Sequence, residues 1–212
     1  IGGSVNLVAN PFSQEPGITI ETMIGFQEFG QSQTIPLSTR KFAATINSGL
    51  LNQQYMMYGR LAKLRTDGYR ERGWVDLNSY FLGGVRFDEN VTTRVHFYGG
   101  PFTDGLVYHG LPKSVIEEKA VRRQNLTGYS DGNTFVWTGP RRPQEQESFS
   151  QPHFEFLQEW RISPGTRLNN TLFLVIGEGY FDYDASWADT STLRIGSAYG
   201  FPTNKNPTNA IV

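Results

Sequence analysis

The chain has 212 residues, a net charge of −1 and no cysteine. The near-neutral charge gives no electrostatic basis for binding nucleic acid, and the lack of cysteine excludes a disulfide scaffold, a Cys-ligated metal and thiol catalysis. A mean hydropathy of −0.42 fits a polar soluble protein, and no run of about 18 apolar residues is present that would make a transmembrane helix. The same average fits a β-barrel with a polar lumen, because only every second strand residue then faces lipid. An aromatic content of 14% favours the barrel, since aromatic rings gather at membrane interfaces.

Apolar residues alternate with polar or small residues in the first strand-like segments. The apolar positions are mostly even-numbered, and they are Ile18, Ile20, Ile24 and Phe26, followed by Phe42, Ala44, Ile46 and Leu50. A period of two predicts β-strands with one apolar face. Runs of about nine to eleven residues are long enough for a tilted strand to cross hydrocarbon.

The whole chain is predicted to hold seven long strands after a short strand over residues 1–9. The long strands cover 18–29, 39–50, 55–66, 78–87, 91–100, 152–162 and 167–183. Turns of a few residues at 51–54, 88–90 and 163–166 alternate with long loops at 30–38, 67–77, 101–151 and after residue 184. Long loops on one side only are typical of a membrane β-barrel. The predicted fold is therefore all-β, an antiparallel up-and-down transmembrane barrel of which these strands form part.

The long loops contain arginines beside aromatic rings. The predicted ligand-facing residues are Tyr69, Arg70, Arg72, Trp74, Tyr108 and His109, and the longest loop adds further arginines, including Arg141. Arginine beside aromatic rings suits anionic or chelate ligands, through bidentate hydrogen bonds and stacking. The alternative is that the rings anchor the barrel at the interface and the arginines pair with lipid phosphates or neighbouring acids.

Other features give no sign of catalysis or of a bound metal. The three histidines, His96, His109 and His153, lack the spacing of a zinc site, and no nucleophile, phosphate-loop or dinucleotide motif occurs. We therefore predict no enzymatic activity, no cofactor and no metal. Within the longest loop, residues 113–125 predict a short helix with Ser114 as its N-cap.

Four segments, taken in order, resemble TonB-dependent outer-membrane receptors. GGSVNLVANPF (2–12) resembles the last strand of their plug domain, and GRLAKLRTDGYRERGWVDLNSYFLGGVRF (59–87) is similar to their early barrel strands. HFYGGPFTDGLVYHGLPKS (96–114) and HFEFLQEWRISPGTRLNNTLF (153–173) are similar to later segments of the same proteins. The resemblance covers most of the chain.

The resemblance implies a fragment of a plugged barrel of about 22 strands. Residues 1–12 would be the C-terminal end of the plug, with Gly2, Gly3 and Asn6 at the plug-to-barrel junction, and 13–212 the N-terminal part of the barrel. The implied function is capture and import of a ferric siderophore or similar scarce ligand across the outer membrane of a Gram-negative bacterium. The implied partners are outer-membrane lipid, the TonB energy-transducing complex and a small-molecule chelate, with no nucleic acid.

Two other interpretations stay open on the sequence. A passive porin-like barrel shares every periodicity, and only the plug-like stretch GGSVNLV distinguishes the receptor from it. A soluble antiparallel β-domain that binds a ligand or glycan would also show one apolar face per strand. It would, however, have short loops at both ends of the sheet, unlike the one-sided loops predicted here.

Overall fold

The computed structural model describes residues 11–28, 34–130, 135–182, 194 and 197–200, and in this part the protein is an all-β, antiparallel structure. The predicted short strand over 1–9, with Gly2, Gly3 and Asn6, lies outside the described residues. The strands are β1 (Pro16–Glu28), β2 (Thr34–Ser48), β3 (Tyr55–Asp67), β4 (Trp74–Phe87), β5 (Val91–Gly99), β6 (Phe102–Asp104), β7 (Leu126–Ser130), β8 (Phe135–Pro140), β9 (Glu147–Ser150), β10 (His153–Ser163), β11 (Thr166–Val175) and β12 (Glu178–Phe181). The helices are α1 (Lys113–Glu117) and a 3-10 turn at Ser197–Tyr199. No helix in the described part of the chain is both long and apolar enough to cross a membrane.

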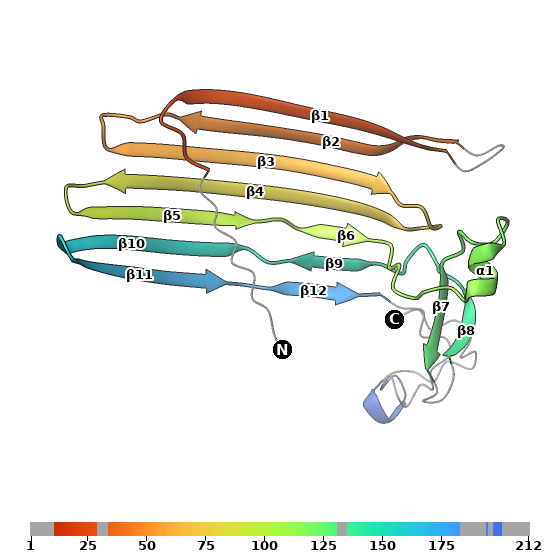
Figure 1. The fold of residues 1–212 in the computed structure, drawn as a ribbon. Coiled ribbons are helices and arrows are strands. Elements are labelled where there is room, and N and C mark those ends of the chain that lie inside the picture. Colours follow the sequence, from red (N-terminus) through yellow and green to blue (C-terminus); the bar gives the residue numbers. More distant parts are fainter. Residues whose placement is uncertain (1–10, 29–33, 131–134, 183–193, 195–196, 201–212) are drawn as a thin grey trace.

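The main sheet has the order β1-β2-β3-β4-β5-β10-β11 (Figure 1). β6, β9 and β12 continue β5, β10 and β11 in unchanged register, so Tyr80 pairs with Gly99 on β5 and Asp76 with Thr103 on β6. Pro101 and Pro152 lie at two of the three breaks, where proline has no N–H to give to the ladder. The described residues therefore form seven long strands, as predicted, in an open sheet without barrel closure.

Several predicted boundaries are wrong because neighbouring strands extend the ladder. The predicted loop 67–77 is shorter, since Thr66 pairs with Val75 and Asp67 with Trp74. The predicted loop 30–38 is also shorter, since β2 begins at Thr34. The predicted loop 101–151 contains β6, β9, the β7–β8 hairpin and α1.

The predicted N-cap of the loop helix is wrong as well. Ser114 lies inside α1, and Pro112 occupies the cap position without a side-chain cap. The Pro112 carbonyl accepts the amides of Val115 and Ile116 at 3.0 and 3.1 Å. A proline is compatible with the start of a helix, because its fixed φ and missing N–H cost nothing there.

One face of the sheet, here called the apolar face, is built from rows of residues that lie opposite one another across all seven strands. One such row consists of Ile18, Ile46, Gly59, Leu82, Phe97, Phe154 and Leu174. Its large side chains are between 42% and 73% exposed. The adjacent rows add further exposed side chains, Ile20 and Leu61 on one side and Met57, Val95 and Leu172 on the other.

The opposite face, here called the polar face, carries charged, polar and aromatic side chains that contact one another. The Glu21 carboxylate binds Lys41 at 2.9 Å and Arg60 at 3.2 Å, which links three strands. The Glu155 carboxylate accepts the Tyr98 hydroxyl at 2.8 Å and lies 3.2 Å from Nδ1 of His96. Four buried side chains, those of Ala43, Met56, Val85 and His96, also lie on this face.

The chain reaches β1 across the polar face. The Phe12 ring stacks on His96 with ring centroids 6.1 Å apart. The Asn47 amide donates to the Pro11 carbonyl at 3.2 Å. Gly83 leaves the room that Phe12 needs, since a Cβ there would lie 3.0 Å from its ring. The segment before β1 is therefore fixed to the polar side of the sheet.

Gly49 follows the end of β2 and lies against the residues that lead into β1, so a substitution at Gly49 measures how tightly these residues pack. Its φ is +67° and a Cβ there would lie 2.6 Å from the Pro16 nitrogen. We expect Gly49→Ala to lower the free energy of unfolding by at least about 1–2 kcal/mol, the cost of a left-handed L-residue. Gly165→Ala is the matched control, because a Cβ there meets nothing within 4 Å. Urea unfolding measures both variants, and equal midpoints would contradict the packing described.

Candidate functional site

The long connections of the sheet gather at one end, opposite the short turns β2–β3, β4–β5 and β10–β11 (Figure 1). The name loop cluster is used here for residues 68–74, 104–128 and 139–147. Backbone hydrogen bonds join its parts. The Gly105 amide donates to the Trp74 carbonyl at 3.0 Å, and the Glu71 amide to the Arg123 carbonyl at 2.8 Å.

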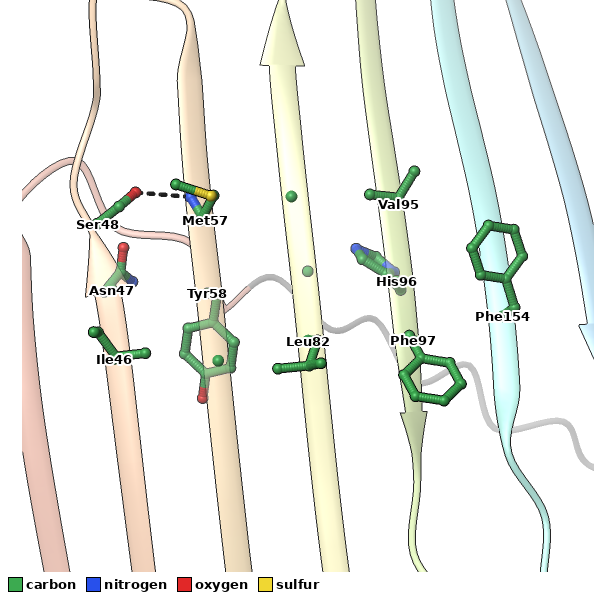
Figure 2. A pocket seen from close by; sticks show the side chains of 13 residues that line it. Ile46, Asn47, Ser48, Met57, Tyr58, Leu82, Val95, His96, Phe97 and Phe154 are labelled. Atoms are coloured by element: carbon green, nitrogen blue, oxygen red, sulfur yellow. Dashed lines mark hydrogen bonds between the residues drawn. The ribbon is translucent and has the colours of Figure 1, made fainter.

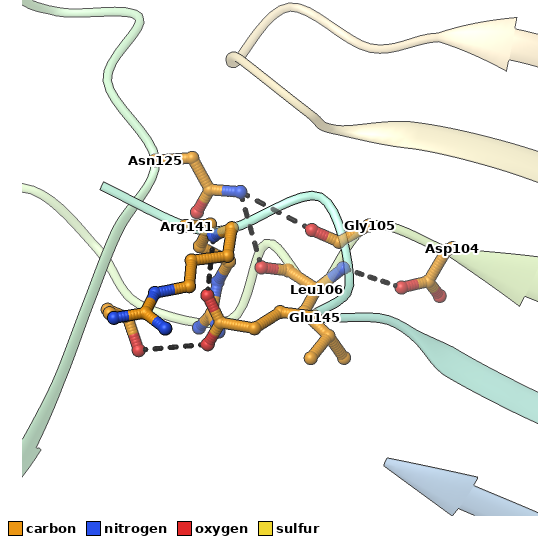
Figure 3. Close-up of polar contacts among 8 residues, drawn as sticks. Asp104, Gly105, Leu106, Asn125, Arg141 and Glu145 are labelled. Carbon is orange, nitrogen blue, oxygen red and sulfur yellow. Dashed lines mark hydrogen bonds and ion pairs between the residues drawn. The ribbon is translucent and has the colours of Figure 1, made fainter. Parts of the chain in front are cut away.

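A buried ion pair lies in the interior of the loop cluster (Figure 3). Arg141 Nη1 lies 3.1 Å from Glu145 Oε1, and the two side chains are 1% and 2% exposed. The Thr127 hydroxyl donates to the same carboxylate oxygen at 3.3 Å, and the Arg142 amide donates to the other at 2.7 Å. Both carboxylate oxygens therefore have donors, as a buried charge requires.

The same arginine has hydrogen-bonding capacity that the protein does not use. Arg141 Nε and Nη2 are buried and have no hydrogen-bond partner among the described residues. These two groups form one edge of the guanidinium, which is the edge that binds carboxylates and similar anions in bidentate fashion. Asn125 lies close by, and its amide donates at 3.4 Å to the carbonyls of Gly105 and Leu106. Buried donors without acceptors are costly, so this edge is suited to an anionic oxygen.

Arg70 holds the loop cluster together through main-chain carbonyls. It donates from Nε and Nη2 to the Gln124 carbonyl at 2.9 and 2.7 Å, and from Nη1 to the His109 carbonyl at 2.5 Å. Burial lowers the pKa of Arg70, and the nearby charge of Arg141 lowers it further. Burial also lowers the pKa of His109, followed by the charges of Arg141 and Arg70. Arg70, Arg141 and His109 thus lie close enough for their charges to act on one another.

All six residues predicted to face a ligand lie in the loop cluster, in different roles. Tyr69 is 45% exposed, with the Arg122 guanidinium 6.0 Å from its ring. Tyr108 is 52% exposed, bonds Glu147 through its hydroxyl and meets Phe181 edge-on. Trp74 begins β4, and Arg72 has a φ of +55° at the tip of the β3–β4 loop. His109 and Arg70 are joined through the carbonyl contact.

No sequence pattern predicts a role for Asn125 or Glu145, and Arg141 is predicted only as one of the loop arginines. These residues form no sequence motif, because it is the folding of the loops that brings them together. The histidines are dispersed, with His96 and His153 on the polar face and His109 in the loop cluster. In the described ranges, no group of three or more His, Cys, Asp or Glu side chains is arranged to hold a metal ion.

Comparison with known proteins finds no family model, no curated protein and no solved structure that matches this chain. A functional proposal therefore depends on the two faces of the sheet and on the geometry of the loop cluster.

The pH response of the loop cluster follows from His109. Its pKa is depressed below the ordinary value of 6.5, so the folded cluster takes up a proton less readily than the unfolded chain. Stability is then full above about pH 6.5 and falls as the pH decreases through 6.5 toward the depressed value. We expect amide protection factors in 105–125 to decrease over this range. His109→Gln should remove the decrease, whereas His153→Gln should keep it. A decrease that survives in His109→Gln would exclude His109 as its cause.

Proposed function

We propose that the chain forms part of the wall of an outer-membrane β-barrel of the TonB-dependent receptor class in a Gram-negative bacterium. The observation that carries the proposal is the apolar face, on which a row of large apolar side chains runs exposed across seven strands. A continuous apolar surface of this kind marks contact with a membrane or a partner. The opposite face is polar and ion-paired, as the lumen side of a barrel is.

On β4, the spacing of the charged residues on the apolar face supports an apolar band as tall as the hydrocarbon region of an outer membrane. On β4, Asp76 and Arg86 lie on this face ten residues apart, with Tyr80 and Leu82 between them. At about 3.4 Å per residue the two positions are about 34 Å apart along the strand. A strand tilt of about 35–45° reduces this to roughly 25 Å in height, which matches the apolar band of outer-membrane barrels.

The sheet edges support a barrel larger than the described strands. β1 pairs only with β2, and β11 only with β10, among the described residues. Unpaired backbone groups in hydrocarbon cost several kcal/mol each, so strands in lipid must close into a barrel. In the proposal, further strands pair with both edges.

The approach of the chain to β1 supports the plug assignment over a passive porin. Pro11 and Phe12 contact the polar face through Asn47 and His96. A segment arriving from the lumen side is expected if residues 1–12 end a plug and 13–212 begin the barrel. Gly2, Gly3 and Asn6 would then form the junction.

The loop cluster supports capture of an anionic chelate. The free edge of Arg141 and the exposed rings of Tyr69 and Tyr108 provide charge and stacking for a ferric siderophore or similar ligand. Active import would then require the TonB energy-transducing complex as a partner. The protein acts in this proposal by binding and passage, without enzymatic chemistry or a cofactor.

The membrane part of the proposal is tested by fluorophores at single introduced cysteines, since the natural chain has none. Ile46, Leu82 and Phe97 report the apolar face, and Thr45, Phe81 and Tyr98, their chain neighbours, report the polar face. In liposomes containing doxyl-labelled lipid we expect strong quenching in the first set and weak quenching in the second. Equal quenching in both sets would contradict a lipid-facing wall and favour the soluble β-domain.

The receptor part is tested by equilibrium dialysis of the reconstituted protein with radioactive ferric citrate, an anionic chelate. We expect binding that Arg141→Met weakens at least tenfold, the loss of one charged bidentate contact of about 1.5–3 kcal/mol. Arg167→Met is the control, because this exposed arginine lies at the β10–β11 turn. Equal binding by both variants would contradict the loop cluster as the site of capture.

A further inference from the structure

Three basic side chains meet at the loop end of the apolar face. Arg40 on β2 lies directly opposite Arg65 on β3, and Lys63 lies on the same face two residues along β3. Arg40, Lys63 and Arg65 are here called the basic patch, and all three are exposed. Like charges directly opposite each other destabilise a sheet unless an anion lies between them.

The protein supplies only part of the needed negative charge. Asp76 lies opposite Arg65 on β4, 3.0 Å from Lys63 and 3.8 Å from Arg65. Arg40 makes no ion pair in the part of the chain that the structure describes. Lys63 and Arg65 therefore share one carboxylate while Arg40 has none, and the basic patch keeps a positive charge that faces outward from the sheet.

Two apolar hollows continue from the basic patch along the same face. The first has a volume of about 260 Å³ and lies between Phe42, Leu61 and Tyr80, with Lys63 at its rim. The second, a groove of about 620 Å³, runs over Gly59 and Gly84 between Ile46, Met57 and Leu82. Figure 2 shows side chains of this groove on successive strands. Its volume lies within the roughly 300–1,000 Å³ typical of small-molecule sites.

The two glycines create the groove. A Cβ on Gly59 would lie 3.2 Å from Ile46 and 3.5 Å from Leu82, and a Cβ on Gly84 would lie 3.5 Å from Val95. Larger residues at these positions would fill the space between the neighbouring side chains. The face thus combines a positively charged end with an apolar depression that leads away from it.

We propose that this surface is a binding site for a phospholipid with a net negative charge. The phosphate lies between Arg40 and Arg65, where guanidinium groups bind phosphate in bidentate fashion. An acyl chain follows the hollows over Leu61 and the Gly59–Gly84 groove. A soluble phosphate would match the charge but leave the apolar groove uncovered, so the charge and shape together favour a lipid. The inference rests on the proposed function, because it requires the apolar face to lie in a membrane.

The test uses the protein reconstituted in phosphatidylcholine vesicles, with a fluorophore at Leu61→Cys beside the basic patch. Brominated phosphatidylglycerol and brominated phosphatidylcholine serve as quenchers in parallel samples. We expect phosphatidylglycerol to be preferred. The triple variant Arg40→Gln, Lys63→Gln, Arg65→Gln should lose about fivefold in preference per neutralised residue, on the scale of about 1 kcal/mol for each basic residue. Arg86→Gln, on the same face at the turn end, should keep the preference.

A second variant and a competitor complete the test. Gly84→Leu fills the groove and should weaken the preference with the basic patch intact. Binding of inorganic phosphate that weakens in the triple variant, without any preference for phosphatidylglycerol, would overturn the lipid assignment in favour of a free anion. Equal quenching by both lipids would overturn the lipid site and leave the membrane wall in place. Absence of quenching by either lipid would instead contradict the membrane wall itself.

Discussion

The antiparallel register of the sheet, which shifts only near the strand ends at Gly25 and Ser163 among the described residues, is the constraint on which the rest of the structure depends. Side chains alternate between faces, so a shift of one residue in any strand would exchange its apolar and polar sets. The register holds from Ile18 on β1 to Leu174 on β11. Polar contacts reinforce it, since Glu21 joins β1 to Lys41 on β2 and to Arg60 on β3. The character of each face follows directly from this alignment.

The two faces place opposite demands on their surroundings. The polar face pairs Glu21 with Lys41 and Arg60 and receives Phe12 over Gly83. No segment of the described residues covers the apolar face. Its large apolar side chains carry no polar groups that would need hydrogen bonds in hydrocarbon. A bilayer also requires every strand edge to be paired. In the proposed barrel, the apolar face would contact lipid and further strands would pair with the open edges.

The loop cluster combines rigidity with unused binding capacity. Arg70 ties the loops together through carbonyls, and the Arg141–Glu145 pair is buried with donors on both carboxylate oxygens. A buried ion pair is weak evidence for stability, because desolvation offsets much of the attraction. The edge of Arg141 that has no partner among the described residues is more informative, since a purely structural arginine would use it. A rigid sheet that carries such loops at one end is a common arrangement for recognition.

The sequence by itself determined the strands, their faces and the side of the long loops, because side-chain alternation and turn chemistry act over a few residues. It failed where partners extend an element, as at Trp74, and where Pro112 rather than Ser114 begins α1. Only the tertiary structure decided that β5 pairs with β10, that Arg40 lies opposite Arg65, and that Asn125, Arg141 and Glu145 meet. How close these residues lie in space depends on strand pairing and on the course of the loops. No local sequence pattern encodes either of these.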